Sequence, residues 1–277
     1  MVSTATTIAC LITLFVTLVV PVIILAVYAA RNRGQGVVSA WFLGAAGFFV
    51  TQILIRVPIL TALSATEGYA TLSSAHPLLF TFLLAFTAGL FELAGRFGAA
   101  KLMRKRLTYR RSLAAGLGHG GIEAMLLVGM TYVSNLAYIA MINSGAFDAL
   151  MAETAAMGVD VTQLEMLRDQ LVNFPASIFL LASLERLLTM AAHAAMSMIV
   201  CYSLHAGHMW KGLLLCLGIH TLLDTTTVFS LLFNQGKLSQ GAAYTIIYLL
   251  LAVAAVLSIL VLKGIRSRWP DPTEEAV

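Results

Sequence analysis

Long apolar stretches separated by short polar connections dominate the hydrophobic pattern of this chain. A helix needs about 20 predominantly apolar residues to cross a hydrocarbon core of roughly 30 Å. Stretches of that length predict about seven membrane-spanning helices, at residues 6–30, 37–62, 77–99, 112–142, 174–202, 209–233 and 240–262. The pattern therefore predicts an all-α fold, a polytopic transmembrane helical bundle.

The composition agrees with this pattern. The 277 residues are 60% hydrophobic and 11% charged, with a mean hydropathy of +0.90, which excludes an ordinary soluble domain. We expect a multi-pass protein of the plasma membrane with the lipid bilayer as its partner. No internal repeat or soluble segment is evident, so residues 1–277 are predicted to form a single transmembrane domain. The first apolar stretch has no basic residues before it, which favours an uncleaved signal anchor over a removable signal peptide.

Lysine and arginine gather on one side of the predicted spans. Alternate connections carry Arg31, Arg33, Lys101, Arg104, Lys105, Arg106, Arg110, Arg111, Lys211, Lys263, Arg266 and Arg268. The opposite side carries only Arg168 and Lys237. Because cytoplasmic loops retain positive charge, this asymmetry predicts an external N-terminus and an internal C-terminus, with residues 263–277 as a cytoplasmic tail. The basic pI, near 9.1, follows from this topology, so no nucleic-acid partner is expected.

The connection at residues 143–173 is longer and acidic, and it falls on the predicted outer side. Leu164, Leu167 and Leu171 recur at spacings of three and four residues, which predicts an amphipathic helix within this segment. Two interpretations are open: a solvated connector between spans four and five, or a lid over a central cavity.

Ionisable residues inside the predicted spans are the candidates for function. A charged side chain at the bilayer centre costs roughly 2.5–3.5 kcal/mol on the translocon scale, so it persists where it has partners and a task. Three pairs are spaced four residues apart and so share a helix face: His119 with Glu123, His220 with Asp224, and Glu92 with Arg96. Apolar segments contain all three cysteines, Cys10, Cys201 and Cys216. We expect them to be buried thiols and assign them no further chemistry.

These ionisable groups also fall at similar depths. Measured along each helix from its predicted inner end, at about 1.5 Å per residue, they lie about 12–20 Å deep. The groups are Glu92, His119, Glu123, His193, His220 and Asp224. A common layer favours one buried polar site over unrelated packing pairs.

Carboxylates and imidazoles in a dry pocket suit two kinds of chemistry. A carboxylate can take the proton of a water while imidazoles stabilise an oxyanion. Alternatively, His119, Glu123, His193 and His220 are candidate metal ligands, and three histidines with a carboxylate suit zinc. The spacing does not match His-Glu-x-x-His, and no Gly-x-Ser-x-Gly element is present.

The chain resembles the YhfC family of intramembrane proteases. The resemblance rests on the run GHGGIE at residues 118–123, on His193 in a later apolar helix, and on His220 four residues before Asp224. That family is similar to the CAAX-processing, bacteriocin-processing and PrsW-type membrane peptidases. The resemblance implies hydrolysis of a peptide bond in a membrane-embedded or membrane-anchored substrate.

The resemblance also implies roles for individual residues. In the broader group a glutamate and a later histidine activate water, which here implies Glu123 and His193. A His-x-x-x-Asn or His-x-x-x-Asp pair holds the oxyanion there, which implies His220 and Asp224. The double glutamate of the broader group is absent, so His119 is an extra catalytic group or a metal ligand. An aspartate at 224 is a poor oxyanion donor unless it is protonated or metal-bound, so metal-dependent and metal-free mechanisms both stay open.

Two further pairs are assigned supporting roles. Glu92 with Arg96 is interpreted as a neutralising ion pair, and Glu185 beside Arg186 as a similar pair whose arginine alternatively clamps a carboxylate. The rival function is a proton-coupled transporter or channel, because intramembrane acids and histidines also form proton relays. Groups that converge in one closed pocket would favour hydrolysis, whereas a string that reaches both membrane faces would favour transport.

Overall fold

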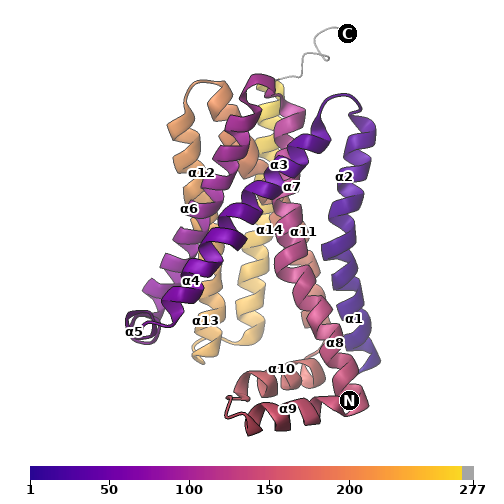
Figure 1. The fold of residues 1–277 in the computed structure, drawn as a ribbon. Coiled ribbons are helices and arrows are strands. Elements are labelled where there is room, and N and C mark those ends of the chain that lie inside the picture. Colours follow the sequence, from indigo (N-terminus) through magenta and orange to yellow (C-terminus); the bar gives the residue numbers. More distant parts are fainter. Residues whose placement is uncertain (270–277) are drawn as a thin grey trace. The chain divides into compact units, whose positions relative to one another are not determined.

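The computed structural model describes residues 1–269, and this part of the chain is built from helices without strands (Figure 1). The elements in chain order are α1 (Thr4–Leu14), η1 (Phe15–Val19), α2 (Val20–Arg31), α3 (Val37–Phe48), η2 (Phe49–Arg56), α4 (Val57–Ser64), α5 (Glu67–Ala75), α6 (Pro77–Met103), η3 (Arg104–Arg106), α7 (Tyr109–Glu123), η4 (Ala124–Gly129), α8 (Met130–Ser144), α9 (Ala146–Ala156), α10 (Thr162–Asn173), α11 (Ala176–His205), α12 (Met209–Asp224), η5 (Thr225–Thr227), α13 (Val228–Asn234) and α14 (Gln240–Arg268).

The seven predicted spans are confirmed as helices of sufficient length and apolarity. In the described residues these helices run over Thr4–Arg31, Val37–Ser64, Pro77–Arg106, Tyr109–Ser144, Ala176–His205, Met209–Asn234 and Gln240–Arg268. Each predicted range differs from the observed one by a few residues at its ends, because hydropathy marks the apolar centre of a helix and not its capped termini. The orientation of the termini stays a prediction.

The acidic connection at 143–173 contains α9 and α10. Gly145, at φ 83°, separates α8 from α9, a backbone conformation that glycine adopts without strain. Before α10, Asp160 accepts hydrogen bonds from the Thr162 hydroxyl at 2.6 Å and the Thr162 amide at 2.9 Å. These hydrogen bonds, the hydroxyl first, lower the pKa of the Asp160 carboxyl. Helix α14 extends to Arg268, and residues 270–277 of the predicted tail lie outside the described residues.

The chain forms two compact units, here called unit 1 and unit 2. Unit 1 comprises Met1–Ile23 and Ala124–Leu187. Its apolar core includes Cys10, Tyr132 and Leu171. The Thr13 hydroxyl donates to the Phe179 carbonyl at 2.8 Å and lies 2.7 Å from the Ser183 hydroxyl.

Unit 2 comprises Ile24–Glu123 and the chain from Leu188 onward. Close packing of α3 against α7 depends on missing side chains. A Cβ at Gly44 would lie 1.8 Å from the Ala115 carbonyl oxygen, and a Cβ at Gly118 would lie 2.0 Å from the Trp41 carbonyl oxygen. Small residues let membrane helices approach until their backbones touch. This contact fixes α7, which carries His119 and Glu123, against α3.

The three cysteines are buried and unpaired. Cys10 and Cys216 are 0% exposed and Cys201 is 2% exposed. The expectation of buried thiols is confirmed.

Candidate active site and metal centre

Glu92 is the central residue of the polar cluster inside unit 2. Its Oε2 atom lies 2.7 Å from His220 Nε2 and 3.0 Å from each of His119 Nε2 and Arg96 Nη2. The carboxylate is nearly fully buried, with the residue 4% exposed. The ion pair between Glu92 and Arg96 that the spacing predicts is present. The contacts to two histidines from other helices go beyond that interpretation.

The second carboxylate oxygen of Glu92 contacts Gln52, which in turn contacts Arg56, and the sequence singled out neither residue. Oε1 accepts a hydrogen bond from Gln52 Nε2 at 2.9 Å, and Arg56 Nη1 donates to Gln52 Oε1 at 3.3 Å. Arg56 Nη2 also donates to the Leu84 carbonyl at 2.8 Å. Gln52 and Arg56 lie in η2, a π-helical segment, and such segments are frequent at functional sites. The sequence feature that could have predicted this contact is the spacing of four residues between Gln52 and Arg56.

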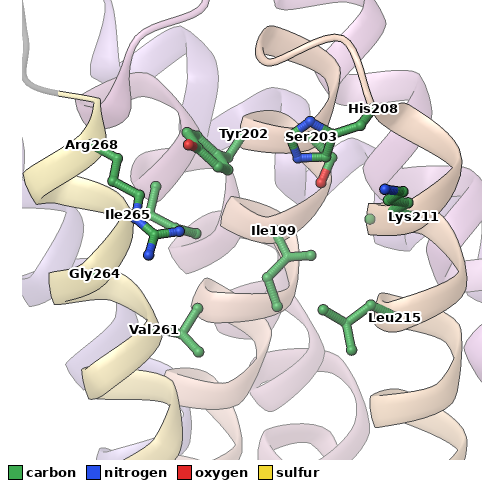
Figure 2. A pocket seen from close by; sticks show the side chains of 11 residues that line it. Ile199, Tyr202, Ser203, His208, Lys211, Leu215, Val261, Gly264, Ile265 and Arg268 are labelled. Atoms are coloured by element: carbon green, nitrogen blue, oxygen red, sulfur yellow. The ribbon is translucent and has the colours of Figure 1, made fainter.

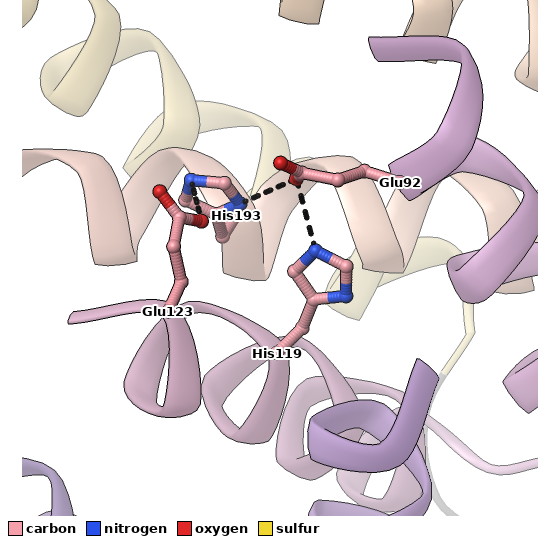
Figure 3. A group of neighbouring side chains, drawn as sticks. All are labelled: Glu92, His119, Glu123 and His193. Atoms are coloured by element: carbon pink, nitrogen blue, oxygen red, sulfur yellow. Dashed lines mark hydrogen bonds and ion pairs between the residues drawn. The ribbon is translucent and has the colours of Figure 1, made fainter. Parts of the chain in front are cut away.

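His193 connects Glu123 to the rest of the cluster (Figure 3). Its Nε2 atom lies 2.9 Å from Glu123 Oε2, and its Nδ1 atom lies 2.6 Å from Arg96 Nη2 and 3.7 Å from Glu92 Oε2. A guanidinium only donates hydrogen bonds, so Nδ1 accepts from Arg96. The hydrogen of a neutral His193 ring therefore lies on Nε2 and points to Glu123.

Glycines on α7 let the helix with His193 come close. A Cβ at Gly120 would lie 2.9 Å from His193 Cβ, and a Cβ at Gly116 would lie 2.7 Å from Ala194 Cα. The element that approaches these glycines is α11, which carries His193.

His220 and Asp224 also meet, as their spacing on α12 predicts. His220 Nδ1 lies 3.4 Å from Asp224 Oδ2, and the Asp224 side chain is 38% exposed. His220 thus has a carboxylate near each ring nitrogen. Glu185 and Arg186 form an ion pair within unit 1.

Four buried donors lie close enough to share one cation. One ligand atom from each of Glu92, His119, Glu123 and His193 can be chosen so that all lie within 4.8 Å of one another. Figure 3 shows these side chains converging, with Glu123 and His119 rising from the same helix. Compared with the ligands expected from the sequence, this group contains Glu92 in the place of His220.

Comparison with known proteins places the chain in a family. The family model for the YhfC intramembrane metalloprotease matches residues 16–249. The chain belongs to the YhfC family. It is 30% identical over 234 residues to "Uncharacterized membrane protein YhfC" of Bacillus subtilis strain 168, a match that covers 84% of this chain and 87% of that relative. No solved structure matches. The resemblance inferred from residues 118–123, His193, His220 and Asp224 is confirmed at the level of the family.

The metal implied by the YhfC family name fits part of the donor set. Two carboxylates and two imidazoles are typical ligands of zinc. His119 Nδ1 is buried without a hydrogen-bond partner among the described residues, and its Nε2 atom points to Glu92. Glu92, His119 and Glu123 therefore fit as ligands.

His193 fits that set less well. A metal-bound imidazole ordinarily donates its other N–H to an acceptor, whereas Arg96 donates to His193 Nδ1. A cation on Nε2 would require loss of the hydrogen that faces Glu123. The contact with Arg96 therefore suits His193 for a hydrogen bond to Glu123 more than for ligation.

Proposed function

We propose that this YhfC-family chain is an intramembrane metallopeptidase that hydrolyses a peptide bond of a membrane-embedded or membrane-anchored substrate. The observation that carries the proposal is the convergence of Glu92, His119, Glu123 and His193 within 4.8 Å, inside helices long enough to span a membrane. Intramembrane ionisable groups are costly, so a buried cluster of this density supports a chemical task.

Of the three residues that fit as ligands, Glu92 and His119 would hold the cation and Glu123 would face the water as its base, with zinc the ion that best suits the donor atoms. A bound divalent ion polarises a carbonyl and makes a coordinated water acidic. Gln52 and Arg96 hold the Glu92 carboxylate in place through their hydrogen bonds. Such supporting contacts orient ligands and tune their basicity.

Glu123 carries out the proton transfers, and His193 orients its carboxylate. Glu123 accepts a proton from the attacking water as the oxygen bonds to the scissile carbonyl carbon. Glu123 then gives this proton to the departing amine nitrogen as the carbon–nitrogen bond breaks, which restores the carboxylate. His193 donates its Nε2 hydrogen to Glu123 at 2.9 Å and so orients the carboxylate for both transfers.

His220 and Asp224 are proposed to act on the oxyanion side. His220 lies 2.7 Å from Glu92 through Nε2 and presents Nδ1 to Asp224. An imidazole held between two carboxylates is a favourable place for positive charge, which would oppose the negative charge of a tetrahedral intermediate. Asp224 is then a positioning residue for His220, which removes the need for it to donate to an oxyanion.

Reconstituted protein with a panel of fluorogenic single-span peptides tests this function. Glu123→Gln is expected to lower the rate of cleavage by about 10²–10⁴-fold, because it removes the proton-transfer group. His193→Ala is also expected to lower it, because it removes the hydrogen bond that orients Glu123. His76→Ala is the matched control, because His76 is an exposed residue between α5 and α6. This variant should cleave the peptides at the rate of the wild type. Undiminished cleavage by both site variants would remove the assignment.

Metal content separates the metal-dependent from the metal-free mechanism. We expect the purified wild type and His76→Ala to carry one zinc per chain by elemental mass spectrometry, and Glu92→Gln and His119→Ala to carry much less. A chelator should remove zinc and cleavage together, and added zinc should restore both. Full cleavage by a zinc-free preparation would exclude the metal-dependent mechanism. Glu123 would then activate the water without a metal.

A proton relay is the second candidate function. It is favoured by the line of contacts from Glu123 through His193, Arg96, Glu92 and Gln52 to Arg56. Proton flux into sealed proteoliposomes with a pH-sensitive dye tests it. Flux that Gln52→Leu abolishes, without any peptide cleavage by the wild type, would establish transport in place of hydrolysis.

A further inference from the structure

A pocket of about 410 Å³ lies in unit 2, away from the polar cluster and between the ends of three helices (Figure 2). This volume is within the range of about 300–1,000 Å³ that ligand pockets occupy. Residues from α11, α12, α14 and the connection before α12 line it: Ile199, Tyr202, Ser203, His208, Lys211, Gly212, Leu215, Val261, Gly264, Ile265 and Arg268.

The lining is amphipathic. Lys211, Arg268 and His208 supply basic groups, and within residues 1–269 no acidic residue lines the pocket. Ile199, Leu215, Val261 and Ile265 supply an aliphatic wall. In Figure 2, Val261 and Leu215 lie toward one end of the pocket, and Tyr202 and His208 lie toward the other. The site therefore suits a molecule with an anionic group joined to a hydrocarbon chain.

Aromatic residues mark the depth of the basic end. Trp269 follows α14 directly, stacks on His205 with ring centroids 4.5 Å apart, and lies 6.0 Å from the Tyr202 ring. Tryptophan and tyrosine concentrate at the level of lipid headgroups. From Arg268, Val261 is about 10 Å along the helix, at about 1.5 Å per residue. The pocket thus extends from headgroup depth into the depth of the acyl chains.

Gly264 leaves room for a chain to lie against α14. It faces the pocket, and a Cβ built there meets no atom within 4 Å. Side chains on both sides of this position in the lining, Val261 and Ile265, are aliphatic. An unfilled strip between apolar side chains accommodates a methylene chain without displacing protein atoms.

We propose that this pocket binds an anionic glycerophospholipid. Its phosphate pairs with Lys211 and Arg268, its polar glycerol region meets the hydroxyls of Ser203 and Tyr202, and one acyl chain lies along the aliphatic wall beside Gly264. Basic residues near the membrane surface attract anionic lipids, and two cations in the lining of one pocket localise that attraction. The site is independent of peptide hydrolysis.

A second basic pocket supports the choice of a lipid for the first. That pocket, of about 370 Å³, is lined by Arg104, Lys105, Arg106, Leu107, Thr108, Leu204 and His205. It has more cations but no aliphatic wall comparable to that of Ile199, Leu215 and Val261. Charge alone thus does not distinguish the proposed site; the combination of cations and a hydrocarbon-sized groove does.

Native mass spectrometry of the delipidated, detergent-solubilised chain tests the proposal. The probes are phosphatidylglycerol, phosphatidylcholine with the same acyl chains, and glycerol phosphate. We expect phosphatidylglycerol to bind at least tenfold more tightly than either of the others. Lys211→Gln with Arg268→Gln should weaken its binding roughly tenfold or more. Arg33→Gln with Lys263→Gln removes the same charge from exposed positions outside the pocket and should change binding less than twofold.

A second pair of variants tests the hydrocarbon part of the site. Gly264→Leu fills the groove and should weaken phosphatidylglycerol binding several-fold. Gly98→Leu places the same side chain at another open, exposed helical position and should leave binding unchanged. Equal binding of the two lipids, equal loss in both double variants, or glycerol phosphate bound as tightly as the lipid would each overturn the proposal. Unchanged thermal unfolding of the variants shows that the fold is retained.

Discussion

Units 1 and 2 both bury hydroxyl side chains among apolar helices, but in the described residues only unit 2 also buries carboxylates, an arginine and histidines. The buried polar residues of unit 1 are Thr6, Thr13, Thr17 and Ser183. Each carries a hydroxyl, and Thr17 donates to a carbonyl of its own helix, the Thr13 oxygen, at 2.8 Å. Unit 2 buries the ionisable residues Glu92, Arg96, His119, Glu123, His193 and His220.

The difference separates polar packing from a polar site. A hydroxyl in a membrane helix can donate a hydrogen bond to the backbone carbonyl one turn earlier. Its burial therefore costs little free energy and needs no partner on another helix. A carboxylate or guanidinium cannot do this, and each one buried in unit 2 depends on groups from other helices. Burial of polar atoms alone is therefore weak evidence of function, whereas mutual dependence of ionisable groups is strong evidence.

The largest expected effect comes from removing the central carboxylate. Glu92→Leu leaves Arg96 as a buried charge without its carboxylate, which should destabilise the protein by about 3–5 kcal/mol in detergent-induced unfolding. Glu92→Leu with Arg96→Leu removes both charges and should recover much of that loss while remaining inactive. A double variant no more stable than Glu92→Leu would contradict the account of Arg96.

A smaller effect is expected where glycines permit close packing. Gly118→Ala drives a Cβ against the Trp41 carbonyl, a backbone atom, and should cost about 1–3 kcal/mol. In unit 1, Gly129→Ala meets a side-chain atom, Leu18 Cδ2, at 2.4 Å, and this side chain can rotate away. Thermal unfolding of the two variants should therefore show the larger loss for Gly118→Ala. The reverse order would mean that α3 and α7 separate readily.

The smallest effect is expected for the hydroxyls of unit 1. Thr13→Val removes the bonds to Phe179 and Ser183 and should cost about 0.6 kcal/mol, the average for hydrogen bonds between membrane helices. Its cleavage rate and zinc content should equal those of the wild type. A loss of zinc in Thr13→Val would contradict the conclusion that the buried hydroxyls of unit 1 serve packing alone.

The fold was largely predictable because membrane spans are encoded locally. Each span needs only a sufficient apolar length, so hydropathy located all seven helices in the described residues. Pairs within one helix were equally accessible: His220 meets Asp224 and Glu92 meets Arg96, as a spacing of four residues requires.

The centre of the site was not predictable in the same way. Glu92 was interpreted as the partner of Arg96 alone, because spacing reveals contacts along a helix and not between helices. Its contacts with His119, His220 and Gln52 depend on how α6 packs against three other elements. His119 and Glu123 share a face of α7, yet their contacts differ, with Glu92 for the first and His193 for the second.

The burial of all three native thiols has a practical consequence for membrane topology. Since Cys10, Cys201 and Cys216 are at most 2% exposed, water-soluble maleimides have almost no access to them. Single cysteines can therefore be introduced at exposed loop positions such as Arg33 and Ala65 in the natural background, without first replacing sulfur atoms that fill the core. Labelling of intact cells against permeabilised ones then reports directly which loops face the cytoplasm.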